Sequence, residues 1–370
     1  MNLVHVEVYC DLQDIGAHRW NDLWRRSEVP SVFSRFEWIE PWWHRFAEGR
    51  ELRVLAAYAG DMLLGILPTA WSDGRDECKV SLLGEGHADY AAVLTDARHP
   101  QAFAAMLDSL VGALPRRARL EFPEVRSDTR YYTALENLTT RINSHWTANE
   151  KVVCPRARLD GDRAQQLADK PSLRRKARKL GRIGAIHVTH YTAADDILPC
   201  LPDFFEQHIA RWRTTEFPSL FTDARNRAFY QDLAARFSGS GQLIFTRLCV
   251  DETPVAYHLG FVSEGDFIWY KPSFNPEYSK SSPGEVLIRE LILLAAERGL
   301  TGLDFTRGDE AFKLRFADSY RYVQAFVRHP SLFQAARVRS AAGAKRLAKK
   351  VIPGQAINWL KKLATTRDGN

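Results

Sequence analysis

The chain has 370 residues, of which 45% are hydrophobic and 26% charged, and this is the composition of a soluble globular protein large enough for two domains. No run approaches the roughly 18 apolar residues that a membrane helix requires, and the first residues lack the basic and apolar regions of a signal peptide. The five cysteines are scattered without metal-binding spacing, which favours reduced thiols in a cytoplasmic protein and no metal site.

The positive charge of the chain is concentrated near its C-terminus. Of the net charge of +6, residues 331–370 contribute +8, so residues 1–330 carry a net charge of −2. This disfavours a nucleic-acid-binding domain. Basic and apolar positions alternate in residues 331–370, which predicts a basic amphipathic tail that lies on an anionic membrane surface, or docks on its own domain or a partner. We therefore expect a cytoplasmic protein, held at the inner face of the membrane if the tail binds lipid.

The first half of the chain predicts a mixed α/β unit. A strand comes first, followed by two helices, three strands with turn residues between them, a helix, a strand, a helix and a last strand. The ranges, in this order, are 4–10, 15–27, 34–47, 52–60, 63–71, 79–96, 100–114, 118–125, 129–142 and 151–159.

The second half repeats this order of elements. Its ranges are 185–192, 195–212, 223–237, 242–252, 254–265, 266–274, 283–299, 302–306, 309–317 and 321–330. No repeat of individual residues accompanies the repeat of elements. We expect two copies of one α/β unit, residues 1–160 and 185–330, with a linker at 161–184 and a tail at 331–370.

The linker contains a short basic helix. Leu173, Ala177 and Leu180 form one apolar stripe on it. The remaining positions are mostly basic: Arg174, Arg175, Lys176, Arg178, Lys179 and Arg182. A solvated helix packed across the junction explains this pattern, and so does a surface that faces an anion or a phosphate. Nucleic-acid binding is disfavoured because no aromatic residue lies among these charges.

The start of the helix at 283–299 has two interpretations. Ser282 and Glu285 have the spacing of a capping box, and Pro283 is at the first helical position, where its missing N–H costs nothing. An ordinary helix start would therefore explain the segment.

The same helix start also suits an anion. The backbone N–H groups of Gly284, Glu285 and Val286 face the positive end of the helix dipole, and glycine lets a ligand approach the backbone closely. Glu285 adds a negative charge to the first turn, which would oppose a pyrophosphate unless Lys280 or Arg289 compensates it.

Charged residues concentrate where the strand at 302–306 ends. They are Asp304, Arg307, Asp309, Glu310 and Lys313. Asp304 points to the opposite face of the strand from its two neighbours. Such a concentration at a strand-to-helix junction suits a catalytic site. The alternative is a self-satisfied salt-bridge cluster, with Glu310 and Lys313 as an i, i+3 pair.

Five further side chains are candidates. His258, in an apolar strand, either packs or faces a ligand, and Tyr270 is a candidate general acid or substrate contact. Trp269 points to the opposite face from Tyr270. His208 and Arg211 share one face of a helix, and we expect them to border the acceptor.

The order of elements and several local motifs resemble a known superfamily. A unit of this order with a polar loop before its third helix resembles the GNAT acyltransferases. Two units in tandem resemble the Fem-type peptidyltransferases and their relatives in cellulose and exopolysaccharide biosynthesis. The local resemblance to that last group rests on "SFNPEYSKSSPGEVLIREL" and "GLTGLDFTRGDEAFKLRFA" in the second half, with "FFEQHIARW" and, in the first half, "SRFEWIEPWWHRF".

The resemblance implies that the pyrophosphate of coenzyme A lies at the polar loop of the second unit. The candidates for donor binding are Ser281, Ser282, Gly284, Glu285, Val286 and Arg289. This loop has fewer glycines than is usual for acetyl-CoA-binding relatives. The equivalent segment of the first unit, "LTDARHPQAF", has none, so we expect a donor only in the second unit.

Acyl transfer to an amine needs a base, a polarised carbonyl and an acid for the leaving thiolate. The catalytic candidates are Asp304, Arg307, Asp309, Glu310, Lys313, Tyr270 and His258, and the substrate candidates are His208, Arg211 and Trp269. We expect an N-acyltransferase that moves an acyl group from a coenzyme A or acyl carrier protein thioester to a small amine acceptor, in polysaccharide or cell-envelope biosynthesis. The basic linker and tail would contact an acidic carrier.

Two alternatives stay open. A Fem-type transferase that uses aminoacyl-tRNA would have a long coiled-coil insertion, which the sequence lacks. A non-catalytic accessory protein at the membrane would keep the fold and use the tail for recruitment, and the sparse phosphate loop is consistent with it.

Overall fold

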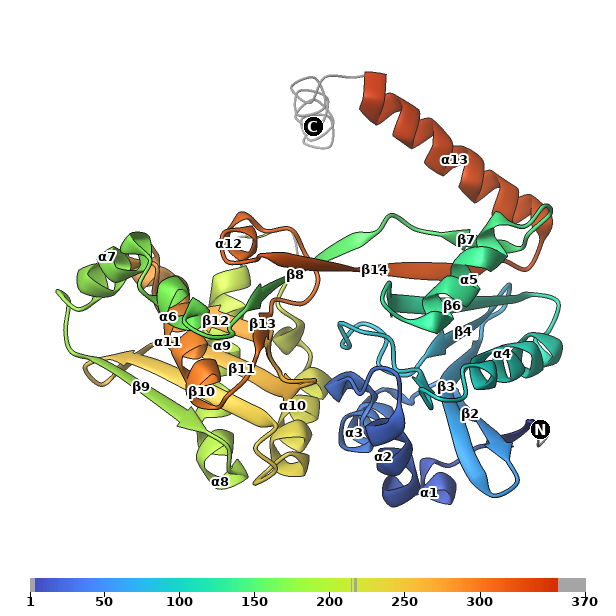
Figure 1. The fold of residues 1–370 in the computed structure, drawn as a ribbon, viewed down its shortest axis with the longest axis horizontal. Coiled ribbons are helices and arrows are strands. Elements are labelled where there is room, and N and C mark those ends of the chain that lie inside the picture. The colour runs from blue at the N-terminus through green and yellow to red at the C-terminus, as the bar shows by residue number, and fades with distance from the viewer. Residues whose placement is uncertain (1–3, 214, 216–217, 352–370) are drawn as a thin grey trace.

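The computed structural model describes residues 4–213, 215 and 218–351. One mixed sheet of 14 strands runs through this part of the chain, with helices on both faces (Figure 1). The mixed α/β class expected from the sequence is confirmed.

The elements of the first half follow the predicted order. Its helices are α1 (Leu12–Ile15), α2 (Ala17–Arg26), α3 (Phe36–Phe46), α4 (Gln101–Ala113) and α5 (Arg130–Thr140). Its strands are β1 (His5–Tyr9), β2 (Glu51–Ala59), β3 (Met62–Asp73), β4 (Cys78–Leu82), β5 (Leu94–Thr95), β6 (Ala118–Arg126), β7 (Trp146–Ala148) and β8 (Val152–Arg158). The strand expected at 79–96 is broken because Gly84 and Gly86 adopt positive φ angles of 92° and 83°.

The second half begins with the linker. Its helices are α6 (Arg163–Ala168), α7 (Pro171–Leu180), α8 (Ala194–Ile197), α9 (Leu201–Trp212), α10 (Ala224–Arg236), α11 (Pro283–Glu297), α12 (Ala311–Leu314) and α13 (Leu332–Val351). Its strands are β9 (Ile186–Tyr191), β10 (Leu243–Val250), β11 (Thr253–Ser263), β12 (Asp266–Phe274), β13 (Gly302–Asp304) and β14 (Ser319–Arg328).

The two halves exchange their last strands. The strand order is β1-β2-β3-β4-β6-β14-β8-β13-β12-β11-β10-β9. β8 of the first half pairs with β13 of the second, and β14 of the second half pairs with β6 of the first. β8 and β14 also pair with each other, so the sheet continues without a break across the middle of the molecule.

Three hydrophobic cores cover the sheet. One core is shared by both halves and includes Trp38 on α3 and Phe229 on α10, whose rings meet edge to face at 5.2 Å. The second lies between the other face of the first half and α4 and α5. The third lies between the other face of the second half and α6, α7 and α11. Between the two halves, Glu124 of β6 pairs with Arg307, which follows β13.

The C-terminal tail begins as the helix α13, which extends away from the body (Figure 1). The rest of the predicted tail, residues 352–370, lies outside the described residues. None of the helices in the described ranges is long and apolar enough to cross a membrane.

Candidate active site

A pocket opens where β12 and β13 part. The two strands pair in parallel only as far as Ile268 and Asp304, and β12 continues to Phe274 after β13 has ended. The pocket has a volume of about 220 Å³ and lies between the end of β12, the start of α11 and α12. Its lining residues are Arg211, Trp269, Pro272, Ser273, Phe274, Ser279, Ser282, Gly284, Glu285, Ile288 and Phe312.

The pocket brings together residues that the sequence analysis assigned to two different roles. Ser282, Gly284 and Glu285, expected to bind the donor, line it together with Trp269 and Arg211, expected to contact the acceptor. Its walls also contain the rings of Phe274 and Phe312. The sequence analysis did not identify these two residues, because each resembles an ordinary core residue in its segment.

The start of α11 differs from the predicted capping box. Ser282 is in the left-handed conformation, with φ 55°, and its side chain makes no capping hydrogen bond. Its carbonyl oxygen instead accepts from the N–H groups of Glu285, at 3.0 Å, and Val286, at 3.3 Å. Of the three N–H groups expected to face an anion, only that of Gly284 has no acceptor among the described residues. The capping box prediction is therefore wrong, and the backbone offers an anion one donor here.

The charge of Glu285 is compensated by residues from distant segments. Its carboxylate meets Lys176 of α7 at 2.5 Å and Arg315 at 2.8 Å. Burial raises the pKa of this carboxyl, but the hydrogen bonds from Lys176 and Arg315 outweigh it, so the pKa is lowered. Arg289, one of the two residues that the sequence offered for this role, instead donates to the carbonyl of Ala168 and pairs with Glu290.

Arg211 brings a positive charge to the pocket. Its half-buried guanidinium stacks on the ring of Phe274, 4.1 Å from the centroid, and forms no ion pair with a described residue. Burial lowers the pKa of this group. A cation held in this way is ready to accept an anionic group of a ligand.

The charged cluster at the end of β13 is completed by the first half of the chain. Arg307 pairs with Glu124, which lies at a positive-φ bend of β6, and meets Asp89 at 3.4 Å. Lys313 is buried and donates to the carbonyl of Arg307 at 2.7 Å and to Glu310 at 2.9 Å. Both Asp309 and Glu310 are exposed. Burial raises the pKa of the Glu124 carboxyl, and Arg307 opposes this.

Lys271 also belongs to this cluster and was missed by the sequence analysis. It is half-buried, with its ammonium group 4.2 Å from the ring centroid of Tyr270, and forms no ion pair with a described residue. Burial lowers the pKa of Lys271, and the nearby charge of Asp89 opposes this effect. In the sheet Lys271 lies opposite Leu259, a residue of the shared core. It therefore projects from the same face of β12 as the shared core, whereas Trp269 packs in the third core on the other face.

Tyr270 and Asp304 are buried in the seam between the halves rather than in the pocket. The Tyr270 hydroxyl accepts from Tyr230 at 2.9 Å and donates to the carbonyl of His87 at 2.7 Å. The Asp304 carboxylate accepts from the Tyr90 hydroxyl at 2.8 and 2.9 Å. Burial raises the pKa of Asp304. These contacts hold both side chains in place.

The two candidate histidines are in the protein interior. His208 bonds the hydroxyl of Ser219 at 2.7 Å, and His258 stacks on Trp269 and accepts the backbone N–H of Tyr270 at 3.2 Å. Burial lowers the pKa of each histidine to about 3, so both are neutral at physiological pH. His258 holds the irregular stretch of β12 beside the pocket without lining it. Two donor candidates, Ser281 and Val286, are likewise buried next to the pocket.

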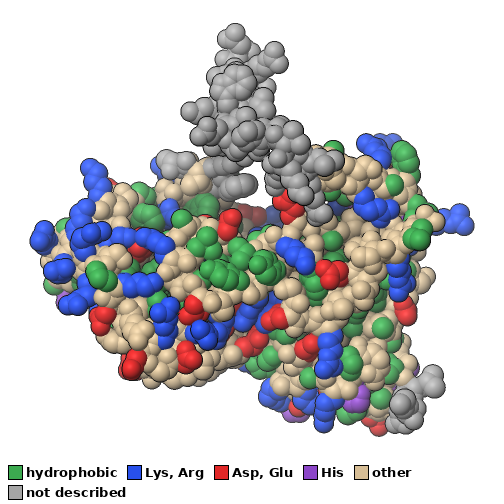
Figure 2. Space-filling view, turned by 45° about the horizontal axis from the view of Figure 1, so that its top comes forward, with side chains coloured by type: hydrophobic (Ala, Val, Ile, Leu, Met, Phe, Trp, Pro, Cys, Tyr) green, Lys and Arg blue, Asp and Glu red, His purple; other side chains and the backbone are tan. Residues whose placement is uncertain are grey.

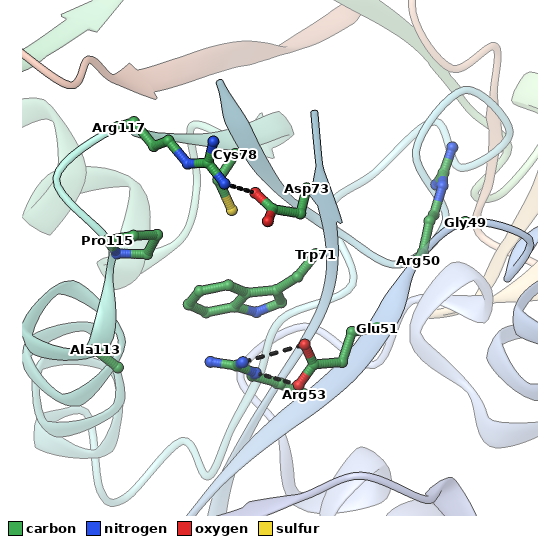
Figure 3. Close-up of a pocket in the computed structure, with 10 residues that line it drawn as sticks. All are labelled: Gly49, Arg50, Glu51, Arg53, Trp71, Asp73, Cys78, Ala113, Pro115 and Arg117. Carbon is green, nitrogen blue, oxygen red and sulfur yellow. Dashed lines mark hydrogen bonds and ion pairs between the residues drawn. The ribbon is translucent and has the colours of Figure 1, made fainter. Parts of the chain in front are cut away.

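In the first half, the position between β4 and β6 that corresponds to this pocket is closed. The segment after β4 returns so that the N–H of Ala91 donates to the carbonyl of Glu124 at 2.9 Å. A different cavity, of about 640 Å³, lies at the opposite end of these strands (Figure 3).

The acids of this second cavity already have partners. Glu51 pairs with Arg53, which stacks on Trp71 at 4.1 Å, and Asp73 pairs with Arg117 at 2.5 Å (Figure 3). Because these charges satisfy each other, Glu51 and Asp73 offer a ligand no free carboxylate.

Comparison with known proteins places the pocket inside a recognised domain. Residues 170–314 match the acetyltransferase (GNAT) domain family. No curated protein matched the sequence. Among solved structures, FemX has a TM-score of 0.59 at 10% identity, covering 87% of this chain and 97% of that chain.

Two further structures have the same fold. The C-terminal domain of a putative lysylphosphatidylglycerol synthetase from Agrobacterium fabrum has a TM-score of 0.53 at 14% identity, covering 88% of this chain and 95% of that one. L-PGS from Bacillus licheniformis has a TM-score of 0.52 at 12% identity, covering 84% and 91%. The matched domain contains the whole pocket, so the pocket lies in the part of the chain, residues 170–314, that is similar to the acetyltransferase (GNAT) domain family.

Proposed function

We propose that the chain is an N-acyltransferase that binds a thioester donor in the pocket at the start of α11 and transfers its acyl group to an amine. The observation that carries this proposal is the position of the pocket. It opens where β12 and β13 part, inside the matched domain, with Arg211, three serines and the Gly284 N–H at an aromatic-walled cavity. These groups suit a phosphate followed by a narrow chain.

The acyl group then reaches the gap between β12 and β13, and the amine approaches from the side of the charged cluster. The amine nitrogen attacks the thioester carbonyl, so that a C–N bond forms and the C–S bond breaks. The amine loses a proton to a carboxylate, and the sulfur leaves as a thiolate that takes up a proton. Glu124 suits the role of base because its pKa is raised, which brings it closer to the working pH.

The other charged residues of the cluster have supporting roles in this proposal. Arg307 fixes Glu124 and Asp89, and Lys313 braces the loop through the Arg307 carbonyl. Lys271 lies on the acceptor side. Asp309 and Glu310, exposed beside α12, are the alternative bases.

The wider setting is also a proposal. The motifs of the second half favour an amine acceptor in polysaccharide or cell-envelope biosynthesis, in the cytoplasm, and the basic tail favours contact with the inner face of the membrane. As part of this proposal, the chain consists of two α/β units, residues 1–160 and 185–330. An aminoacyl-tRNA donor, as in Fem-type transferases, is the second candidate, and the similarity of the fold to FemX favours it.

A Gly284→Asp variant tests the donor site. A side chain at this position would meet Phe274 at 3.5 Å, an ordinary contact, so the variant should fold while placing a carboxylate in the pocket. We expect acetyl-CoA, longer acyl-CoAs or free CoA to raise the melting temperature of the wild type and to lose that effect in the variant. The matched control is Gly112→Asp on α4, where a side chain meets nothing within 4 Å. Equal stabilisation of both variants by CoA would contradict this site.

A further inference from the structure

One face of α7 carries a basic surface. Arg174, Arg175 and Arg178 of α7 and Arg182, just after its end, are exposed, and none forms an ion pair with a described residue. Lys and Arg side chains gather at the end of the molecule where α7 lies (Figures 1 and 2). Unpaired like charges on one short helix repel each other, so this arrangement indicates an anionic partner.

The basic surface is attached to the wall of the donor pocket. Lys176 of α7 pairs with Glu285 of the pocket, and Lys179 donates to the carbonyl of Lys280 at 2.7 Å. A groove of about 260 Å³, lined by Arg174, Arg178 and Arg289 with Ala177, continues between α7 and α11. A molecule lying on this surface would therefore be beside the pocket entrance.

The pocket itself is too small to enclose a whole nucleotide-bearing donor. Its volume of about 220 Å³ is below the roughly 300–1,000 Å³ of pockets that enclose drug-sized ligands. Only one backbone N–H is free at the helix start, so the site is a weak cradle for a pyrophosphate. The pocket suits a narrow pantetheine-like arm, with the anionic remainder of the donor outside.

We propose that α7 docks an acidic helix of a carrier protein, which presents the acyl group on a phosphopantetheine arm to the pocket. This proposal rests on the proposed function, because it assumes that a thioester is the donor. A helix of 10 residues is about 15 Å long, which matches one helix of a small protein. RNA is disfavoured because the exposed positions of α7 contain no aromatic residue to stack on a base.

The test compares two double charge reversals of the full chain. Arg174→Glu/Arg178→Glu alters the α7 surface. The matched control, Arg75→Glu/Arg116→Glu, makes the same change of charge at two exposed arginines of the first half, which form no ion pair with a described residue. Binding is measured by fluorescence anisotropy with a labelled bacterial holo-acyl carrier protein, at low and at high salt. Activity is measured as thiol release from two free donors, acyl-pantetheine and acyl-CoA, with a panel of amino acids and amino sugars as acceptors.

We expect the carrier protein to bind the wild type and the control equally, to bind more weakly at high salt, and to lose about tenfold or more in affinity with the α7 variant. Thiol release from acyl-pantetheine should change less than twofold. Equal binding of the carrier to both variants, or none to the wild type, would overturn the docking proposal.

The remaining outcomes separate this proposal from the function on which it rests. If thiol release from acyl-CoA falls in the α7 variant as much as carrier binding does, the surface holds the nucleotide of CoA instead, and docking is overturned while the acyltransferase function stands. Displacement of the carrier by a short RNA hairpin at equal concentration would overturn docking in favour of RNA. If no donor releases thiol even with the wild type, the proposed function fails, and docking fails with it.

Discussion

At the scale of single residues, Arg211 gives the sharpest test of the pocket. It is half-buried without an acidic partner among the described residues, and such a charge contributes little to folding. We expect Arg211→Leu to weaken binding of the anionic donor about tenfold, while the melting temperature stays the same or rises, because the apolar part of the side chain still packs on Phe274. Isothermal titration with acyl-CoA measures the affinity.

The neighbouring Arg213→Leu is the matched control for this experiment, because Arg213 is exposed and does not line the pocket. If Arg211→Leu binds the donor as tightly as the control does, the assignment of Arg211 to the donor is wrong.

The buried histidines predict that the fold is sensitive to acid. Burial lowers the pKa of His258 to about 3, and an unfolded histidine titrates near 6.5. Below about pH 6.5 the unfolded state therefore binds the extra proton, and stability falls as the pH decreases, by at most about 1.4 kcal/mol per pH unit for each such histidine. We expect His258→Gln to flatten the fall in the free energy of unfolding between pH 6.5 and 4.5, measured by urea denaturation. Replacement of the exposed His18 by Gln should leave the slope unchanged, and an equally steep fall in both variants would refute the prediction.

At the scale of elements, periodicity predicted more than local chemistry did. The order of helices and strands followed from alternating and helical patterns, and the start of α11 was expected at Pro283, where it lies. The capping box was not formed: Ser282 has a left-handed backbone, and its side chain makes no capping hydrogen bond. The partners of Glu285 were also missed, since sequence spacing identifies neighbours within a turn, whereas Lys176 and Arg315 reach it only through folding.

This three-residue contact gives α11 a pH-dependent attachment to α7. The folded-state pKa of Glu285 is lowered, so its contribution to stability is present above the unfolded value of about 4.5 and is lost as the pH falls through the folded value. We expect Glu285→Gln to lower the free energy of unfolding by about 1 kcal/mol at pH 7 and by much less at pH 3. Urea denaturation at both pH values measures this. Glu277→Gln, at an exposed carboxylate with no described ion pair, is the control, and a loss from Glu285→Gln that does not depend on pH would contradict the argument.

At the scale of the whole molecule, the repeat of two units was readable but the exchange of their last strands was not. A strand has the same alternation of side chains whichever neighbour it pairs with, so the patterns of β8 and β14 fit either half equally well. The same exchange explains why the site was only partly predictable. Asp304 and Arg307 were identified as charged residues of the second half, but Glu124 of the first half lies in a strand whose own pattern signals no site.

The exchange also predicts that the two halves unfold together. Tyr90 of the first half donates to the Asp304 carboxylate of the second, and Arg321 of β14 meets the same carboxylate at 3.2 Å. All three lie at the seam, so Tyr90→Phe leaves a buried carboxylate short of a donor and should lower the free energy of unfolding by about 1.5–3 kcal/mol. In the wild type, hydrogen exchange should show that β2 and β10 lose protection at the same denaturant concentration. In Tyr90→Phe, this concentration should be lower, by the same amount for both strands. Tyr9→Phe, whose hydroxyl lies near the surface, should cost less than about 0.5 kcal/mol. Loss of protection in one half while the other stays protected would show that the halves are independent, and that the exchanged strands do not bind them into one cooperative unit.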